Sequence, residues 1–203
     1  MSKNLETRMT ENIEVREVGE GEEKEIRLQG YALTFDSISE DMGFREVIRK
    51  GALDETDMSD VVLNINHDNS KVLARNNKRE GPGSLTLKVD DKGLFFDASP
   101  TNTTYAKDLI ENMRNGIVGK CSFAFKLDYS DRDAQTWDWA DDEDDFDLRT
   151  INKIKSIHDV SIVTTPAYKS TSSTVYQRAK ENREEELKQQ QLKRKLEIEL
   201  ELI

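Results

Sequence analysis

The feature that most constrains the fold is a series of short segments rich in β-branched and aromatic residues, separated by turn residues. Such segments are typical of β-strands in an antiparallel or mixed sheet. Asp90–Gly93 separates two of them, and we expect a hairpin there in which Gly93 takes a positive φ. The expected strands cover Ile26–Phe35, Val61–Ile65, Ser84–Val89, Leu94–Ala98, Ser122–Tyr129 and Ile157–Thr164.

One clear helix interrupts these segments. Thr103 or Thr104 can cap its start, and Gly116 can end it. Strands with a few helices that do not strictly alternate predict an α+β domain with a barrel-like sheet. The helical spacing places one apolar face on Tyr105, Leu109, Ile110 and Met113.

Changes in composition divide the chain into four parts. Residues 1–24 are polar, and we expect them to be disordered or loosely attached. Residues 25–168 carry the strand-like segments and form the expected folded domain. Residues 169–175 are rich in Ser and Thr and are expected to be a linker. Residues 176–203 contain neither Gly nor Pro and are expected to form a long C-terminal helix.

The expected C-terminal helix carries an apolar stripe. Such a stripe is an amphipathic face that can pack on a partner helix, and packing on its own domain is the other interpretation. The stripe is too short to establish a coiled coil by itself. Its members are Leu192, Leu196, Leu200 and Ile203.

The composition excludes several classes of protein. No run of about 18 apolar residues is present, so we expect no membrane span. The first 25 residues lack the apolar core of a secretory signal. Cys121 is the single cysteine, and His67 and His158 are the two histidines, which excludes an internal disulfide and argues against a Cys- or His-rich metal centre. We therefore expect a soluble intracellular protein.

The net charge of −11 is concentrated in one window. Residues 131–147 contain nine acidic side chains and one basic side chain, so this window contributes eight of the eleven net negative charges. A surface that mimics DNA or collects metal and a docking patch for a basic partner are two functional interpretations. We favour a solvated loop between two strands, because the ligand spacing of a calcium loop is absent. Trp137 and Trp139 are expected to tether this loop to the body.

Three polar residues near strand ends could carry chemistry. His67 follows the apolar run 61–65 where a strand exits into a polar loop, so its imidazole can exchange protons at a surface. Ser122 follows a glycine-containing run and opens a strand, which can expose its hydroxyl beside backbone N–H groups. Asp159 interrupts an apolar strand and needs a partner, such as a histidine N–H. Judged from its position in the sequence alone, each of these three residues could have a structural role instead of a chemical one.

The order of several motifs over residues 26–170 resembles the prohead (capsid maturation) protease family of tailed bacteriophages. The last two blocks are the most specific, and the order of the blocks carries the resemblance. The matching blocks are Gly30-Tyr31-Ala32 with Phe35-Asp36-Ser37; Phe44-Arg45-Glu46-Val47-Ile48 with Gly51-Ala52-Leu53; Asn66-His67-Asp68 with Val72-Leu73-Ala74-Arg75; Gly93-Leu94; Gly116 through Cys121-Ser122-Phe123-Ala124-Phe125; and Asp159-Val160-Ser161-Ile162-Val163-Thr164-Thr165-Pro166-Ala167-Tyr168.

The resemblance implies a serine endopeptidase with a fold like the herpesvirus assembly protease, a small β-barrel of mostly antiparallel strands ringed by helices. It implies Ser122 as the nucleophile and His67 as the general base. Asp159 is the favoured third member, and His158 is the alternative because the herpesvirus relatives use a second histidine. Neighbouring side chains of a strand point to opposite faces, so one of these two faces the site. A cysteine protease based on Cys121 is conceivable, but the motif aligns serine with the reactive position.

The resemblance also implies a biological setting. The expected substrates are scaffold and capsid-protein segments, and the chain itself, inside the assembling procapsid in the host cytoplasm. The C-terminal helix is expected to mediate scaffold docking or self-association, and no cofactor, metal, nucleic acid or membrane is implied. A non-enzymatic scaffold or assembly chaperone with a degenerate protease domain is the alternative. An acidic DNA mimic dependent on residues 131–147 is a third interpretation.

Overall fold

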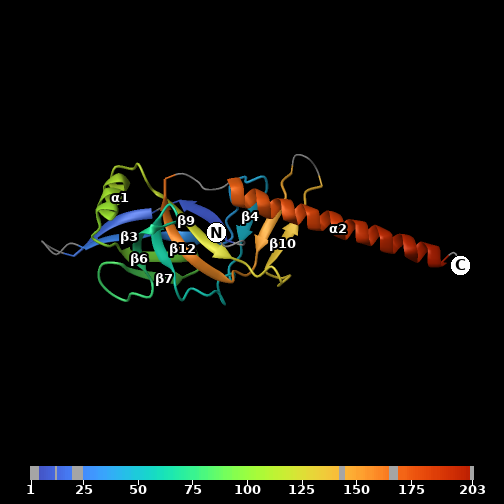
Figure 1. Ribbon diagram of the computed structural model, residues 1–203, viewed down its shortest axis with the longest axis horizontal. Helices are drawn as coiled ribbons and strands as arrows, with labels where there is room; N and C mark the ends of the chain where they lie inside the picture. Colours follow the sequence, from blue (N-terminus) through green and yellow to red (C-terminus); the bar gives the residue numbers. More distant parts are fainter. Residues whose placement is uncertain (1–4, 12, 20–24, 142–144, 165–168, 202–203) are drawn as a thin grey trace.

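The computed structural model describes residues 5–11, 13–19, 25–141, 145–164 and 169–201. Within them, the strands form one nine-stranded and one three-stranded sheet, accompanied by two helices (Figure 1). The elements are β1 (Glu6–Glu11), β2 (Ile13–Val18), β3 (Glu25–Thr34), β4 (Arg45–Ile48), β5 (Val62–Ile65), β6 (Asp68–Arg75), β7 (Ser84–Val89), β8 (Gly93–Ser99), α1 (Thr104–Arg114), β9 (Lys120–Lys126), β10 (Gln135–Asp138), β11 (Leu148–Ile151), β12 (Ser156–Val163) and α2 (Lys169–Glu201).

The larger sheet is mixed and strongly curved. Its strand order is β1-β9-β12-β5-β6-β7-β8-β3-β2, and its neighbouring pairs are antiparallel except for β12–β5 and β6–β7. The curvature brings β1 beside β3, where Thr10 Oγ1 donates to Tyr31 O at 2.6 Å. Because β1 and β3 are far apart in the strand order, this contact makes the sheet a partly open barrel.

All six strands expected from the sequence are present, with small shifts at their ends. The expected α+β class and the predominance of antiparallel pairing are confirmed. Gly93 sits at the predicted hairpin with a φ of 159°. A Cβ at this position would lie 2.0 Å from Leu33 O, so the close approach of β3 also requires glycine. The strands β4, β6, β10 and β11 were not expected. β4, β10 and β11 have only four residues each, and the first half of the eight-residue β6 is polar, so these segments show little periodicity.

The N-terminal segment corrects one prediction. β1 and β2 lie at the two ends of the sheet, although residues 1–24 were expected to be loosely attached. An ion network buries the charges of β1: Arg8 Nε lies 2.6 Å from Glu46 Oε1, and Arg149 Nη1 lies 2.6 Å from Glu6 Oε2. These four side chains are almost fully buried, and each faces opposite charge. β1 could not be recognised from the sequence, because the side chains that form ion pairs with it, Glu46 and Arg149, lie on β4 and β11.

The beginning of α2 corrects a second prediction. Residues 169–175, expected to be a linker, belong to the helix, which begins at Lys169. The ring of Tyr176 stacks on Phe44 with centroids 5.3 Å apart and on Trp137 with centroids 5.9 Å apart. These contacts attach the first turns of α2 to the three-stranded sheet, whose order is β10-β11-β4.

The later turns of α2 extend away from the two sheets (Figure 1). Leu192, Leu196 and Leu200 of the expected stripe are exposed there, and Ile203 lies outside the described residues. Among the described residues, no helix is long and apolar enough to cross a membrane.

The acidic window, residues 131–147, is only in part the solvated loop that the sequence predicts. β10 lies inside it and pairs with β11, while residues 142–144 lie outside the described residues. Trp137 and Trp139 stack on each other with centroids 5.1 Å apart, and Trp137 also packs on Phe44 at 5.0 Å. The predicted tether is therefore confirmed.

α1 closes part of the core as the sequence predicted. Its buried residues are Ala106, Leu109, Ile110 and Met113, and they join one apolar cluster with side chains from β3, β5, β8, β9 and β12. Thr103 occupies the N-cap position without a side-chain capping bond, which differs from the expected cap. Gly116 follows the helix with a φ of 71°, which glycine adopts readily.

Candidate active site

Three side chains from distant parts of the chain form a hydrogen-bonded row. His67 Nδ1 lies 2.6 Å from Asp159 Oδ1, and His67 Nε2 lies 2.8 Å from Ser122 Oγ. A carboxylate can only accept, so Nδ1 carries the hydrogen and Nε2 accepts from the hydroxyl. The His67 side chain is 19% exposed and the Asp159 side chain 11%, so the row is largely shielded from solvent, with part of the imidazole accessible.

A two-residue turn between β5 and β6 presents His67. Ile65 and Asp68 pair in the β5–β6 register, with Asn66 and His67 between them. Asn66 has a φ of 52° and His67 a φ of 57°, as in the type I′ turn that suits the twist of a hairpin. Asn66 N donates to Ile162 O at 3.0 Å, which ties the turn to β12. The polar loop expected after β5 is thus a tight turn that leads directly into β6.

β12 brings Asp159 to His67 and leaves His158 elsewhere. The β9–β12 register shifts between Ile157 and Asp159, so His158 occupies an irregular position in the strand. His158 Nε2 lies 3.0 Å from Ser156 Oγ, and burial and nearby Lys126 lower the pKa of His158. The structure therefore brings the favoured third residue into the row and not the alternative.

β9 places Ser122 in the row and Cys121 in the core. Ser122 is 4% exposed and pairs with Ser161 of β12, while Cys121 belongs to the buried apolar cluster. Burial raises the pKa of the Cys121 thiol to about 12. A thiolate is the reactive form of cysteine, so Cys121 is poorly suited to act as a nucleophile.

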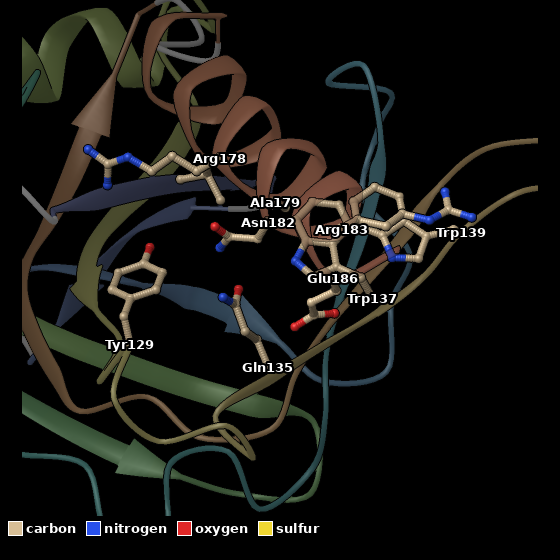
Figure 2. A pocket seen from close by; sticks show the side chains of 10 residues that line it. Tyr129, Gln135, Trp137, Trp139, Arg178, Ala179, Asn182, Arg183 and Glu186 are labelled. Atoms are coloured by element: carbon tan, nitrogen blue, oxygen red, sulfur yellow. The ribbon is translucent and has the colours of Figure 1, made fainter. Parts of the chain in front are cut away.

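A separate cavity of about 500 Å³ lies under α2 and beside β10. Figure 2 shows the two tryptophans next to the α2 side chains Arg183 and Glu186, and Tyr129 and Gln135 on the side facing α2. None of the three residues in the hydrogen-bonded row lines it. The cavity is lined by Tyr129, Gln135, Trp137, Trp139, Val175, Arg178, Ala179, Asn182, Arg183 and Glu186.

The described residues contain no group of three or more His, Cys, Asp or Glu side chains that could hold a metal ion.

Sequence reasoning missed the support around the turn. Ser161 Oγ accepts the backbone N–H of His67 at 2.8 Å, and Thr164 N donates to Asn66 Oδ1 at 3.1 Å. The available signal was the Asn-His pair between two strand-like segments, because Asn and His tolerate a positive φ better than most residues do. Nothing in the sequence indicates that Ser161 lies beside this turn.

A serine hydroxyl, an imidazole and a carboxylate in one hydrogen-bonded row are the arrangement found in serine hydrolases. The family model described as caudovirus prohead serine protease matches residues 11–186. The chain therefore belongs to the caudovirus prohead serine protease family, and its class is a phage capsid maturation protease.

Other comparisons add little to this assignment. Among solved structures, the bacteriophage T4 capsid assembly protease, gp21, is 12% identical, with 80% of this chain and 99% of that chain covered and a TM-score of 0.48. No curated protein sequence matches the chain.

Proposed function

We propose that the chain is a serine endopeptidase in which Ser122 is the nucleophile, His67 the general base and Asp159 the residue that orients the imidazole. The observation that supports this proposal is the row itself, with 2.8 Å from Ser122 Oγ to His67 Nε2 and 2.6 Å from His67 Nδ1 to Asp159 Oδ1. Both distances lie within hydrogen-bond reach, as proton transfer requires.

The reaction is acyl transfer. His67 Nε2 accepts the proton of Ser122 as Oγ attacks the scissile carbonyl carbon, and it then delivers this proton to the leaving amine. In the second half, a water molecule attacks the acyl carbon while His67 Nε2 takes its proton. The bond between the acyl carbon and Ser122 Oγ then breaks, the product leaves as a carboxylic acid, and His67 returns the proton to Oγ. Asp159 keeps the hydrogen on Nδ1 and stabilises the imidazolium in both halves. The mechanism needs no metal or organic cofactor.

The proposed substrates are scaffold and capsid-protein segments, together with the ends of the chain itself. Cleavage takes place inside the assembling procapsid in the host cytoplasm. Membership of the prohead protease family supports this setting. The likeness of the fold to the herpesvirus assembly protease stays a prediction.

We also propose that the exposed part of α2 docks on scaffold or on another copy of the chain. Leu192, Leu196 and Leu200 support this role, because exposed leucines on one helix face gain stability when a partner covers them. A non-enzymatic scaffold or assembly chaperone is the second candidate, and it would use the same helix. The hydrogen-bonded row favours the peptidase.

Purified wild-type and Ser122→Ala proteins test the peptidase. We expect incubation to release terminal peptides from the wild type alone, detected by intact mass, while circular dichroism shows the same fold in both. Addition of purified scaffold and capsid protein then tests the substrates. Equal processing by Ser122→Ala would refute the nucleophile, and no processing of any of these proteins by the wild type would favour the scaffold reading.

A further inference from the structure

Ser161 lies beside the turn that presents His67 and is fully buried on β12. Its Oγ accepts the backbone N–H of His67 at 2.8 Å and can donate its own hydrogen to Asn64 O at 3.4 Å. The hydroxyl therefore gives an acceptor to an amide that lies in the turn between the paired residues of β5 and β6. This contact acts on the main chain of His67 and not on its ring.

The turn needs such support. Asn66 and His67 both adopt positive φ angles, which residues other than glycine retain only where their surroundings hold them. The bonds from Asn66 N to Ile162 O at 3.0 Å and from Thr164 N to Asn66 Oδ1 at 3.1 Å hold the first residue of the turn. Ser161 supplies the bond that holds the second.

One face of β12 thus contacts His67 at two points. Asp159 binds the ring through Nδ1, and Ser161, two residues further along the same strand, binds the main chain. Ser161 also stands directly opposite Ser122 in the β9–β12 register. The position of the imidazole relative to the nucleophile is therefore set through β12.

We propose that Ser161 is a positioning residue that keeps His67 Nε2 within hydrogen-bond reach of Ser122 Oγ, an inference that rests on the proposed function of these two residues. Loss of the Ser161 hydroxyl leaves the His67 amide without this acceptor and frees the strained turn. A displacement of the base by about 1 Å costs roughly 10²-fold in rate.

Labelling with a fluorophosphonate, which reacts with an activated serine hydroxyl, tests the proposal without a known substrate. The control variant is Ser99→Ala, because Ser99 is also a buried serine but lies on β8, separated from β5 by β6 and β7. We expect Ser161→Ala to label Ser122 roughly 10- to 100-fold more slowly than Ser99→Ala at a similar melting temperature. Ser161→Thr, which keeps the hydroxyl, is expected to recover part of the rate. Labelling of Ser161→Ala as fast as Ser99→Ala would overturn the proposal.

Nuclear magnetic resonance provides a readout that does not depend on activity. The chain has two histidines, so ¹⁵N-histidine labelling gives few signals, and His158→Gln assigns them. In a Ser122→Ala background, we expect Ser161→Ala to accelerate solvent exchange of the His67 amide and Nδ1 protons and to leave the signals of His158 unchanged. Unchanged His67 signals would contradict the proposal. If Ser161→Ala does not fold, Ser161→Cys, whose sulfur is a weak acceptor, takes its place.

The two measurements separate two kinds of failure. If wild-type protein and Ser122→Ala label equally, the proposed function fails, and the histidine signals still decide whether Ser161 holds the turn. If the wild type labels at Ser122 but Ser161→Ala is unaffected in both measurements, the proposed function stands and the positioning role is wrong.

Discussion

His67 Nε2 lies 2.8 Å from Ser122 Oγ, although the two residues are 55 positions apart in the sequence. His67 sits in the turn after β5 and Ser122 on β9, and β12 lies between these two strands in the sheet. β12 contributes Asp159, so the strand that separates the two residues also supplies the third member of the row. The pairing of β12 with both neighbours fixes this geometry.

Asp159→Asn is expected to lower kcat by roughly 10⁴-fold, because an amide favours the wrong imidazole tautomer and does not stabilise the imidazolium. His158→Gln is the matched control and should leave kcat close to the wild-type value, since His158 Nε2 contacts Ser156 instead of the row. Cleavage of a peptide copied from a mapped self-processing site measures both. A large loss in His158→Gln with normal activity in Asp159→Asn would reverse the assignment.

Cys121→Ala is expected to retain peptidase activity and to lose stability on the order of 1 kcal/mol, because it removes a buried sulfur from the core. Wild-type protein should also resist iodoacetamide in the folded state, since burial raises the pKa of the Cys121 thiol to about 12. The test measures the activity of wild-type protein after iodoacetamide treatment, and the activity and urea denaturation of Cys121→Ala. Inactivation by iodoacetamide together with inactivity of Cys121→Ala would point to a cysteine nucleophile.

Glu6→Gln is expected to destabilise the fold by about 3–5 kcal/mol at pH 7, because it removes one partner from a buried ion network. Burial alone would raise the pKa of Glu6, but Arg149 and Arg8 lower it from 4.5 to about 2. The ionised carboxylate therefore stabilises the fold above pH 4.5, and this contribution is lost as the pH falls from 4.5 towards 2.

Urea denaturation between pH 7 and pH 2 measures this effect. The stability of Glu6→Gln should vary less with pH than the wild type between pH 4.5 and 2, the window set by the pKa of Glu6. Asp60→Asn is the control, since Asp60 pairs with Arg75 at the surface and its loss should matter far less. Equal losses in both variants would show that the buried network does not hold β1.

Removal of residues 188–203 is expected to leave the melting temperature and peptidase activity unchanged and to reduce incorporation into procapsids. The truncation keeps Tyr176 and Arg183, whose rings and guanidinium pack on Trp137 and Trp139. Incorporation is measured by the amount of protease in purified particles. Replacement of the three leucines at 192, 196 and 200 by Gln in the full-length chain is the matched test of the stripe. Normal incorporation of both forms would contradict docking through this helix.

The strands and the helix that build the core could be predicted because their patterns are local. α1 shows its apolar face through helical spacing, and β5 and β12 are rich in β-branched residues over an ordinary strand length. β1 could not be predicted, because Glu6 and Arg8 resemble a solvated segment until Glu46 and Arg149 come within ion-pair distance. The start of α2 is rich in Ser and Thr and therefore has the composition of a linker. The stacking of Tyr176 on Phe44 stabilises the first part of this helix, and composition does not reveal that contact.

The sequence by itself determined the chemical groups available and the order of motifs that carry the family resemblance, because these depend only on residue identity and spacing. Three features depend on the tertiary structure: the contact of Asp159, and not His158, with His67, the burial of Cys121, and the contact of Ser161 with His67. Each depends on the register between β12 and its neighbours, and the position of His158 depends also on the irregularity between Ile157 and Asp159. A strand shift of one residue exchanges the faces of every side chain, and no local pattern records which register the folded sheet adopts.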